Sequence, residues 1–533
     1  MIKKLVIENF KSFRRFDLDL NSDINIIVGN NESGKTTILE AIHIALTLKH
    51  NGRPLQTELS PYLFNTGVAN EYILEFKKGT NPVPPKILIE VYFNDISGLE
   101  SLKGTNNSRN EDEIGVKVEI VFDEDFAAEY QSLLVNPDKL QLLPIEYYKI
   151  NWYSFANGNI TSRSLPVRVS YIDATAMKLQ NGTDYYLHSV INDTLAPKDR
   201  VTLALAYRTL KETFAQTPEI EAINEALFRQ SNRLTDKPLS LSIDISRRAP
   251  WEATLVPYLD LLPFQLIGQG EQHVLKTLFA LERKVDNDTK VVLLEEPENH
   301  LSYSTMNKLT NKITEHLSGK QLLITTHSPY VLNKLGLDNL ILLSDGRSIR
   351  ITNLPDSTRD YFKKLPGYDT LRIVLAKKAI LVEGPSDELI VQKAYLMEYG
   401  KLPIQDEVDV INVRGLSFAR FLDIAKELRL NVTVVTDNDG NFQHNINQRY
   451  SDYMGVDNIK FCYSEDNHLK TLEPQIVSCN ELAILNKIFG KTYITSESMT
   501  KYMIENKTEW AMKIFETDDT IDFPGYIWNA IKR

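Results

Sequence analysis

The sequence predicts an α/β protein with more than one domain, and three observations support this. A strand pattern that ends near Val28 runs into a glycine-rich loop and then into a helical pattern. A second apolar strand, at 290–294, ends in two carboxylates. From 377 to 436 the chain alternates strand, helix, strand, helix and strand, the order that builds a parallel sheet.

Composition narrows the classes of protein further. The chain has 533 residues and a net charge of −11, so we expect any nucleic-acid site to be a local basic patch on an acidic protein. Two cysteines, Cys462 and Cys479, exclude a disulfide framework and a cysteine-rich zinc module. No apolar run reaches 18 residues, and the N-terminus lacks a signal-peptide core. We therefore expect a cytoplasmic protein with no membrane partner.

The elements follow from periodicity. Period-2 patterns at 2–8, 16–28, 86–94 and 116–122 predict strands, and an apolar stripe over 38–46 predicts a helix. Helical spacing and richness in Ala, Leu, Glu and Gln predict a helical insertion at about 175–250. A helix at 271–281 should precede the strand at 290–294, and another strand should end near Thr325. Turn signals place a domain junction near 355–376.

The glycine-rich loop has the pattern of a phosphate-binding loop, G-x-x-x-x-G-K-[ST], in the required context between strand and helix. Its glycines let backbone N–H groups cradle phosphates, Lys35 reaches the β- and γ-phosphates, and the Thr36 hydroxyl binds Mg²⁺. We expect ATP to be held by this segment and by the threonine that follows it: Gly29, Asn30, Asn31, Glu32, Ser33, Gly34, Lys35, Thr36 and Thr37.

Three further elements complete a nucleotide site. The strand at 290–294 ends in Glu295, which we expect to act on Mg²⁺ through a bound water, and in Glu296, the candidate general base. The next strand is tipped by His327, which would sense the γ-phosphate. Gly268 and Gly270 open a helix whose N–H groups can meet phosphate.

Together these four elements resemble the ABC-type ATPases of the structural-maintenance-of-chromosomes and RecF kind. The opening segment, Ile7-Glu8-Asn9-Phe10-Lys11-Ser12-Phe13, is similar to their first strand and turn. The resemblance implies an ATPase head whose site is completed by a second head, and hence a homodimer or higher oligomer. The segment at 268–272 departs from the usual Leu-Ser-Gly-Gly-Gln signature, which puts the strength of ATP-driven dimerisation in doubt.

A second site is predicted in the C-terminal part. Glu383 follows the first strand of the alternating region, and Asp437 and Asp439 follow its third strand. In a right-handed β-α-β-α-β unit these strand ends meet at one edge, and two aspartates two residues apart would share a face. Clustered carboxylates raise one another's pKa unless a cation lies among them, and oxygen ligands suit Mg²⁺ or Mn²⁺. Such a site can activate water for displacement at phosphorus.

This arrangement resembles the Toprim fold of topoisomerases, primases and related nucleases. An ABC-type head followed by a Toprim domain resembles the OLD (overcoming lysogenisation defect) family of ATP-dependent endonucleases. The resemblance implies an ATPase domain at 1–375 with a helical dimerisation insertion and a Toprim domain at 376–533. It implies metal-binding acids at Glu383, Asp387, Asp437, Asp439 and Glu473, and a phosphate-steadying lysine at Lys507, for which Lys513 is the competitor.

The resulting prediction is an ATP-binding, Mg²⁺- or Mn²⁺-dependent DNA endonuclease of bacterial anti-phage defence. The resemblance leaves open whether the protein acts alone or with a partner. That partner would be a retron reverse transcriptase with its msDNA, or a helicase as in Gabija. The alternative is an ATP-gated sensor or scaffold whose Toprim site is regulatory or cleaves RNA.

Overall fold

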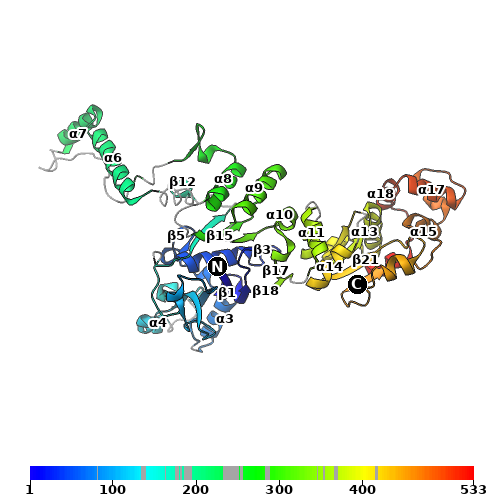
Figure 1. Ribbon diagram of the computed structural model, residues 1–533, viewed down its shortest axis with the longest axis horizontal. Helices are drawn as coiled ribbons and strands as arrows, with labels where there is room; N and C mark the ends of the chain where they lie inside the picture. Colours follow the sequence, from blue (N-terminus) through cyan, green and yellow to red (C-terminus); the bar gives the residue numbers. More distant parts are fainter. Residues whose placement is uncertain are drawn as a thin grey trace. The chain divides into compact units, whose positions relative to one another are not determined.

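The computed structural model describes residues 1–80, 82–133, 140–161, 164–173, 179–180, 183–184, 195–231, 251, 256–282, 289–317, 319–344, 346–351, 354–364, 370–414 and 418–532. The chain divides into two compact units (Figure 1). Unit 1 comprises Met1–Asn25 and Gly34–Thr326, and unit 2 comprises Ile26–Ser33 and His327–Arg533.

The N-terminal sheet of unit 1 is antiparallel throughout. Its order is β2-β1-β6-β8-β7, with β9 also pairing with β8. Leu5, Val6 and Ile7 of β1 are buried in succession, and every side chain of β6 is buried. The strands are β1 (Ile2–Phe10), β2 (Phe13–Asp19), β6 (Ile87–Phe93), β7 (Lys103–Gly104), β8 (Glu113–Phe122) and β9 (Tyr148–Ser154).

Helix α1 (Lys35–Thr47) packs between this sheet and a parallel one. It contacts β1, β6 and β8, and also β10 (Arg168–Asp173), β15 (Thr289–Glu295) and β16 (Gln321–Thr325). The apolar stripe predicted from periodicity is buried, because α1 has a sheet on either side. Strand β15 pairs in parallel with both β10 and β16, which brings the carboxyl end of β15 beside theirs.

The remaining elements of unit 1 are mostly helical. Two helices, α6 (Pro197–Ala215) and α7 (Pro218–Ser231), lie in the predicted insertion, whose last part at 232–250 is outside the described residues. Helix α8 (Gln269–Glu282) contacts β10, β15 and α9. The others are β4 (Lys49–His50), β5 (Arg53–Pro54), α2 (Leu55–Glu58), α3 (Thr66–Lys77), α4 (Ala127–Leu133), β11 (Leu179–Gln180), β12 (Thr183–Asp184), β13 (Tyr258–Leu259), β14 (Leu262–Pro263) and α9 (Tyr303–His316).

One strand pattern of the sequence divides into two strands. The stretch 16–28 forms the end of β2 and then β3 (Ile24–Gly29). Between them the Asn21 N–H donates to Asn25 Oδ1 (2.7 Å), and Asn25 Nδ2 donates back to the Asn21 carbonyl (2.9 Å). This closed turn satisfies the backbone that a continuous strand would have paired. In unit 2, β3 pairs in parallel with β17 (Leu340–Ser344), which pairs antiparallel with β18 (Arg347–Arg350).

The C-terminal sheet of unit 2 is fully parallel. Its order is β20-β19-β21-β22, formed by β19 (Lys378–Val382), β20 (Val408–Asn412), β21 (Asn431–Val435) and β22 (Ile459–Cys462). Helices α13 (Pro385–Tyr399) and α19 (Gly525–Ile531) contact the sheet together with α14 (Ala419–Leu428) (Figure 1). Because β19 and β21 are parallel neighbours, the residues that follow them meet at one edge.

The last helices form a compact cap on α13. Trp510 and the methionines Met499 and Met503 are fully buried in the same core as the apolar residues of α13. These last helices are α15 (Leu472–Cys479), α16 (Leu482–Phe489), α17 (Ser496–Glu505) and α18 (Glu509–Glu516). The other helices of unit 2 are α10 (Pro329–Leu335), α11 (Asp356–Lys364) and α12 (Thr370–Leu375). Among the described residues, no helix is long and apolar enough to cross a membrane.

Candidate functional site

The glycine-rich loop closes tightly at both of its motif glycines. Gly29 ends β3, where a Cβ would lie 2.5 Å from Ser33 Oγ and 2.9 Å from the Leu343 carbonyl oxygen. Gly34 has φ 97°, and a Cβ there would lie 2.4 Å from the ring of Phe13. Only glycine fits either position, so the loop requires both for a steric reason.

The rest of the loop is open toward solvent. Asn30, Asn31 and Glu32 are exposed, and the Ser33 N–H donates to the Asn30 carbonyl at 3.2 Å. Thr37 is buried at the start of α1, and its Oγ1 accepts from Ser12 Oγ at 3.1 Å. Thr37 therefore holds the β1–β2 turn.

Glu295 and Thr36 are directly bonded. The Thr36 hydroxyl donates to Glu295 Oε1, and the Tyr171 hydroxyl donates to Oε2 at 2.5 Å. Burial raises the pKa of Glu295, and the two hydroxyl donors oppose that shift. A threonine hydroxyl beside a buried carboxylate is an oxygen donor set that fits Mg²⁺. Tyr171 was missed by sequence reasoning because its strand, β10, is 124 residues from Glu295 and has no motif of its own.

Lys35 and Glu296 are electrostatically coupled. Lys35 is buried, which lowers its pKa, while Glu296 and then Glu295 act in the opposite direction. Glu296 has a left-handed backbone, φ 44°, and its N–H donates to the Thr325 carbonyl at 3.0 Å. Asn299 Nδ2 donates to Glu296 Oε2 at 2.7 Å. Asn299 is thus a second residue that sequence reasoning missed, although it lies only three positions from Glu296.

The helix that starts at Gly268 and Gly270 packs on the loop after β15. A Cβ on Gly270 would lie 2.4 Å from the His300 carbonyl oxygen, whereas one on Gly268 would meet nothing within 4 Å. Close packing, rather than phosphate alone, therefore requires glycine at Gly270. His327 is exposed between β16 and α10, and the Ser328 side chain accepts from the Val331 N–H to cap α10.

The C-terminal acids gather where β19 and β21 end. Glu383 follows β19, and its Oε1 accepts from the Thr436 hydroxyl and from the Asp437 N–H (3.1 Å). These bonds join the ends of the two neighbouring strands. Thr436 was also missed, although its place directly before Asp437 is a signal that the sequence offered.

Asp387 and Asp437 lie half-buried among other carboxylates. Burial, followed by the charge of Glu383, raises the pKa of Asp387 to about 7, although its carboxylate also accepts from the Gly384 N–H (3.1 Å). Burial raises the pKa of Asp437 to about 9, followed by the charges of Asp387, Glu383 and Glu473. A cation would offset the repulsion within such a set, because carboxylate oxygens are the ligands that hard divalent cations prefer. Within the described ranges, no three such side chains already stand at ligand geometry.

Asp439 differs from the prediction. Its backbone is left-handed, φ 49°, and its side chain is exposed, so the expectation that an extended backbone would place it on the face of Asp437 is wrong. The reason is Asn438, which is fully buried and turns the chain: its Nδ2 donates to the carbonyls of Ser464 and Asp466 at 2.9 and 2.8 Å. The charge of Asp439 still contributes to the raised pKa of Asp437, as the last of the four carboxylates.

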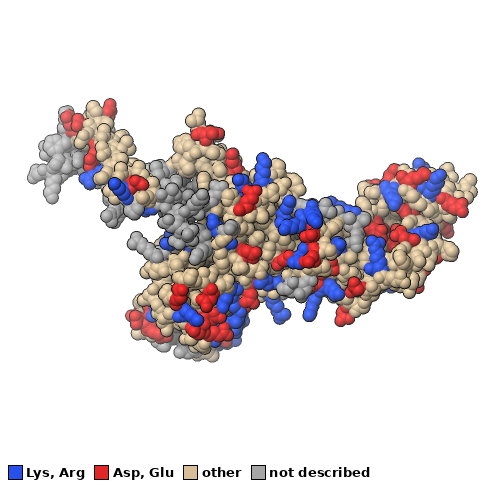
Figure 2. Space-filling model, viewed as in Figure 1, with Lys and Arg blue, Asp and Glu red and all other residues tan. Residues whose placement is uncertain are grey.

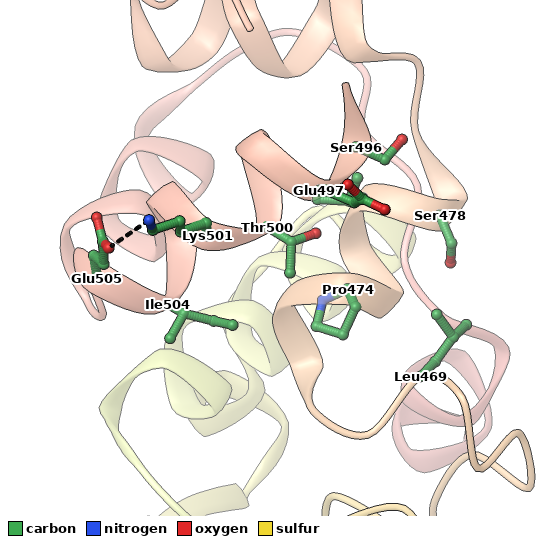
Figure 3. A pocket seen from close by; sticks show the side chains of 10 residues that line it. Leu469, Pro474, Ser478, Ser496, Glu497, Thr500, Lys501, Ile504 and Glu505 are labelled. Atoms are coloured by element: carbon green, nitrogen blue, oxygen red, sulfur yellow. Dashed lines mark ion pairs between the residues drawn. The ribbon is translucent and has the colours of Figure 1, made fainter. Parts of the chain in front are cut away.

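Glu473 lies on helix α15, and its carboxylate is one of those whose charge acts on Asp437. It is 5% exposed, and the Thr471 hydroxyl donates to its Oε2 at 2.7 Å. A cavity of about 540 Å³ lies beside this helix, lined by α15 and α17, with Pro474 and Thr500 among its walls (Figure 3). The Lys501–Glu505 ion pair belongs to its lining (Figure 3). Glu473 is not part of that lining, so we do not assign the cavity to the acid site.

The two candidate lysines have different surroundings. Lys507 is exposed, and the next residue, Thr508, donates its N–H to Ser386 Oγ at 3.1 Å. Ser386 directly precedes Asp387, so the backbone beside Lys507 adjoins the acid segment. Lys513 instead pairs with Glu509 at 3.0 Å within α18. The geometry favours Lys507. On the face shown in Figure 2, basic and acidic side chains are interspersed.

Comparisons with known proteins give the domain classes. Residues 4–149 match an AAA domain model, residues 220–333 match the model "AAA domain, putative AbiEii toxin, Type IV TA system", and residues 374–439 match "Overcoming lysogenization defect protein-like, TOPRIM domain". The predicted combination of an ATPase and an OLD-like Toprim domain is therefore confirmed, and these are domain classes of enzymes.

Individual proteins and solved structures also show similarity to this chain. Endonuclease GajA of Bacillus cereus (strain VD045) is 21% identical over 82% of this chain and 74% of its own length. The DNA replication and repair protein RecF of Streptococcus uberis is 28% identical over 23% of this chain and 31% of its own. A solved SMC head bound to the C-terminal winged-helix domain of ScpA covers 65% of this chain and 96% of its own, at 17% identity and a TM-score of 0.35.

Proposed function

Because the chain joins AAA-type ATPase segments to an OLD-like Toprim domain, we propose that it is an ATP-dependent endonuclease that cleaves DNA phosphodiester bonds. The similarity to an endonuclease over most of the chain supports this proposal, together with a role in anti-phage defence. The single observation that carries it is the carboxylate set of Glu383, Asp387, Asp437 and Glu473, of which Glu473 is buried and the other three are half-buried.

The acids would have different roles at the cleavage site. Glu383 and Asp437, tied together through Thr436 and the Asp437 N–H, are the central ligands we assign to Mg²⁺ or Mn²⁺. When bound, such a cation supplies an activated water and neutralises charge on the phosphate. Asp387 and Glu473 would supply further oxygen ligands, and the exposed Asp439 would bind the metal from the solvent-facing side of the site. Lys507 would bind the scissile phosphate.

The ATPase segments would control this site. Lys35 would bind the β- and γ-phosphates, Thr36 and Glu295 would hold Mg²⁺, and Glu296 would take a proton from the attacking water. His327 would contact the γ-phosphate, and Gly268 and Gly270 would face a second copy's nucleotide. We therefore include a homodimer or larger oligomer in the proposal, while retron and helicase partners stay predictions.

The test is metal-dependent nicking of supercoiled plasmid by Glu383→Gln and by a matched control, Glu388→Gln, on the next helix. Glu383→Gln should lose nicking by at least about a hundredfold, since it removes a ligand charge, and it should still bind ATP. The control should nick like wild type. Nicking that persists undiminished in Glu383→Gln would contradict the proposal.

A further inference from the structure

The segment directly after the aspartate turn forms a π-helix, η10 (Gln443–Gln448). Such helices are rare and are frequently found at functional sites. It is fixed to the acid site, because Asn445 Nδ2 donates to the Asn438 carbonyl at 3.1 Å, between Asp437 and Asp439. The Phe442 N–H, just before the helix, donates to Asn467 Oδ1 at 3.1 Å. Its side chains are therefore held at a set position beside the cleavage site.

The side chains of this helix are neutral and mostly polar. Its sequence, Gln-His-Asn-Ile-Asn-Gln, has no carboxylate, lysine or arginine, in a chain with 131 formally charged Lys, Arg, Asp and Glu residues, 60 basic and 71 acidic. Gln443 and His444 are exposed, and Ile446 is buried as the anchor. Neutral amides that carry both donors and acceptors read base edges, whereas phosphate is usually met by cations.

A hydrogen-bond relay fixes the outermost amide. The Tyr463 hydroxyl donates to Asn447 Oδ1 at 2.9 Å, and Asn447 Nδ2 donates to Gln443 Oε1 at 2.6 Å. This bond occupies one acceptor position of the Gln443 oxygen, and the Gln443 amide nitrogen carries two N–H donors. The same tyrosine packs against Phe442, with ring centroids 5.8 Å apart and planes 28° apart, which stiffens the base of the relay.

From this arrangement we infer that Gln443 reads an acceptor on a nucleobase next to the scissile phosphate, with Tyr463 and Asn447 as positioning residues. A side chain held in advance by such a relay loses little conformational entropy on binding, so it can discriminate between bases. The inference rests on the proposed DNA cleavage and adds to it a base preference at one position near the cut.

The test maps cleavage sites by sequencing the ends produced from a randomised DNA substrate with Mg²⁺ or Mn²⁺. Wild type should prefer particular bases at one position near the cut, and Gln443→Ala should reduce that preference about tenfold, the order expected for one amide–base contact. Tyr463→Phe, which removes only the hydroxyl, should weaken it in the same direction. Gln448→Ala, exposed at the end of the helix and outside the relay, is the matched control and should keep the wild-type profile.

The outcomes separate this inference from the function on which it rests. No cleavage by wild type on any DNA would contradict the endonuclease itself. Cleavage by wild type without base preference, or an unchanged profile in both Gln443→Ala and Tyr463→Phe, would overturn the inference alone. A uniform rise in KM without a change of profile would also overturn it, because it would mean that Gln443 contacts phosphate.

Discussion

At the scale of single residues, the carboxylates of the acid site repel one another when they are ionised. Burial and neighbouring carboxylates raise the pKa of Asp437 from its ordinary 3.8 to about 9, and that of Asp387 to about 7. A carboxyl group whose pKa is raised on folding stabilises the protein while it is protonated, and this contribution is lost as the pH rises through the folded pKa. The metal-free site therefore opposes folding at alkaline pH.

This gives a pH prediction. In EDTA, the melting temperature should fall as the pH rises from about 6 to about 9, and Asp437→Asn should be more stable than wild type by several degrees at the alkaline end. Millimolar Mg²⁺ should restore much of the loss in wild type and little in the variant. Differential scanning fluorimetry across pH measures both, and an equal pH slope in the two proteins would contradict the charge account.

A second residue-scale prediction concerns Asn299. Its 2.7 Å hydrogen bond to Glu296 Oε2 orients the candidate general base. Asn299→Ala should lower kcat for ATP hydrolysis about tenfold and leave KM near the wild-type value, because Lys35 and the loop still bind the phosphates. Lys35→Ala is the contrasting variant and should lose ATP binding. A rise in KM with unchanged kcat in Asn299→Ala would show that Asn299 serves binding instead.

At the scale of elements, close packing at the start of α8 requires glycine at Gly270 but not at Gly268. Gly270→Ala would press a Cβ against the His300 carbonyl oxygen, and Gly268→Ala would point into open space. We expect Gly270→Ala to destabilise the protein by about 1–3 kcal/mol, as overpacking does, and Gly268→Ala to be close to neutral. Chemical denaturation of both variants measures this. Equal stability would mean that the contact at Gly270 relaxes freely.

Elements were predicted well where periodicity and motif coincide. The strand, loop and helix around Lys35 and the alternating region from β19 to β21 were readable from sequence, because local patterns determine both. Asp-Asn-Asp-Gly at 437–440 is itself a turn sequence, but the bonds that hold the turn were not readable, since the Asn438 amide bonds carbonyls 26 and 28 residues away. Tyr171 and Asn447 could not be placed for the same reason: their roles arise from tertiary hydrogen bonds, which no local pattern reports.

At the scale of the whole molecule, the sequence could supply the order of the domain classes but not their exact limits. The ATPase models match 4–149 and 220–333 and the Toprim model begins at 374, whereas the compact units meet at Thr326 and His327. The predicted boundary at 375 and 376 therefore stays a prediction.

This leads to a prediction for the assembled protein. Because Lys35 belongs to the ATPase and the acid set to the Toprim domain, Lys35→Ala should change the ATP response of cleavage while metal-dependent cleavage itself persists. Nicking assays of wild type and Lys35→Ala, each with and without ATP, measure both the ATP response and the metal-dependent cleavage. Complete loss of cleavage in a folded Lys35→Ala protein would contradict this separation of roles.

The central claim is that the carboxylates at the ends of β19 and β21 form the cleavage site. Its most direct test is nicking of supercoiled plasmid by wild type and Asp437→Asn in Mg²⁺ or Mn²⁺, each with and without ATP. The account predicts metal-dependent nicking by wild type and its loss in Asp437→Asn, which keeps the shape of the side chain but not its charge. Equal nicking by the two proteins would contradict it.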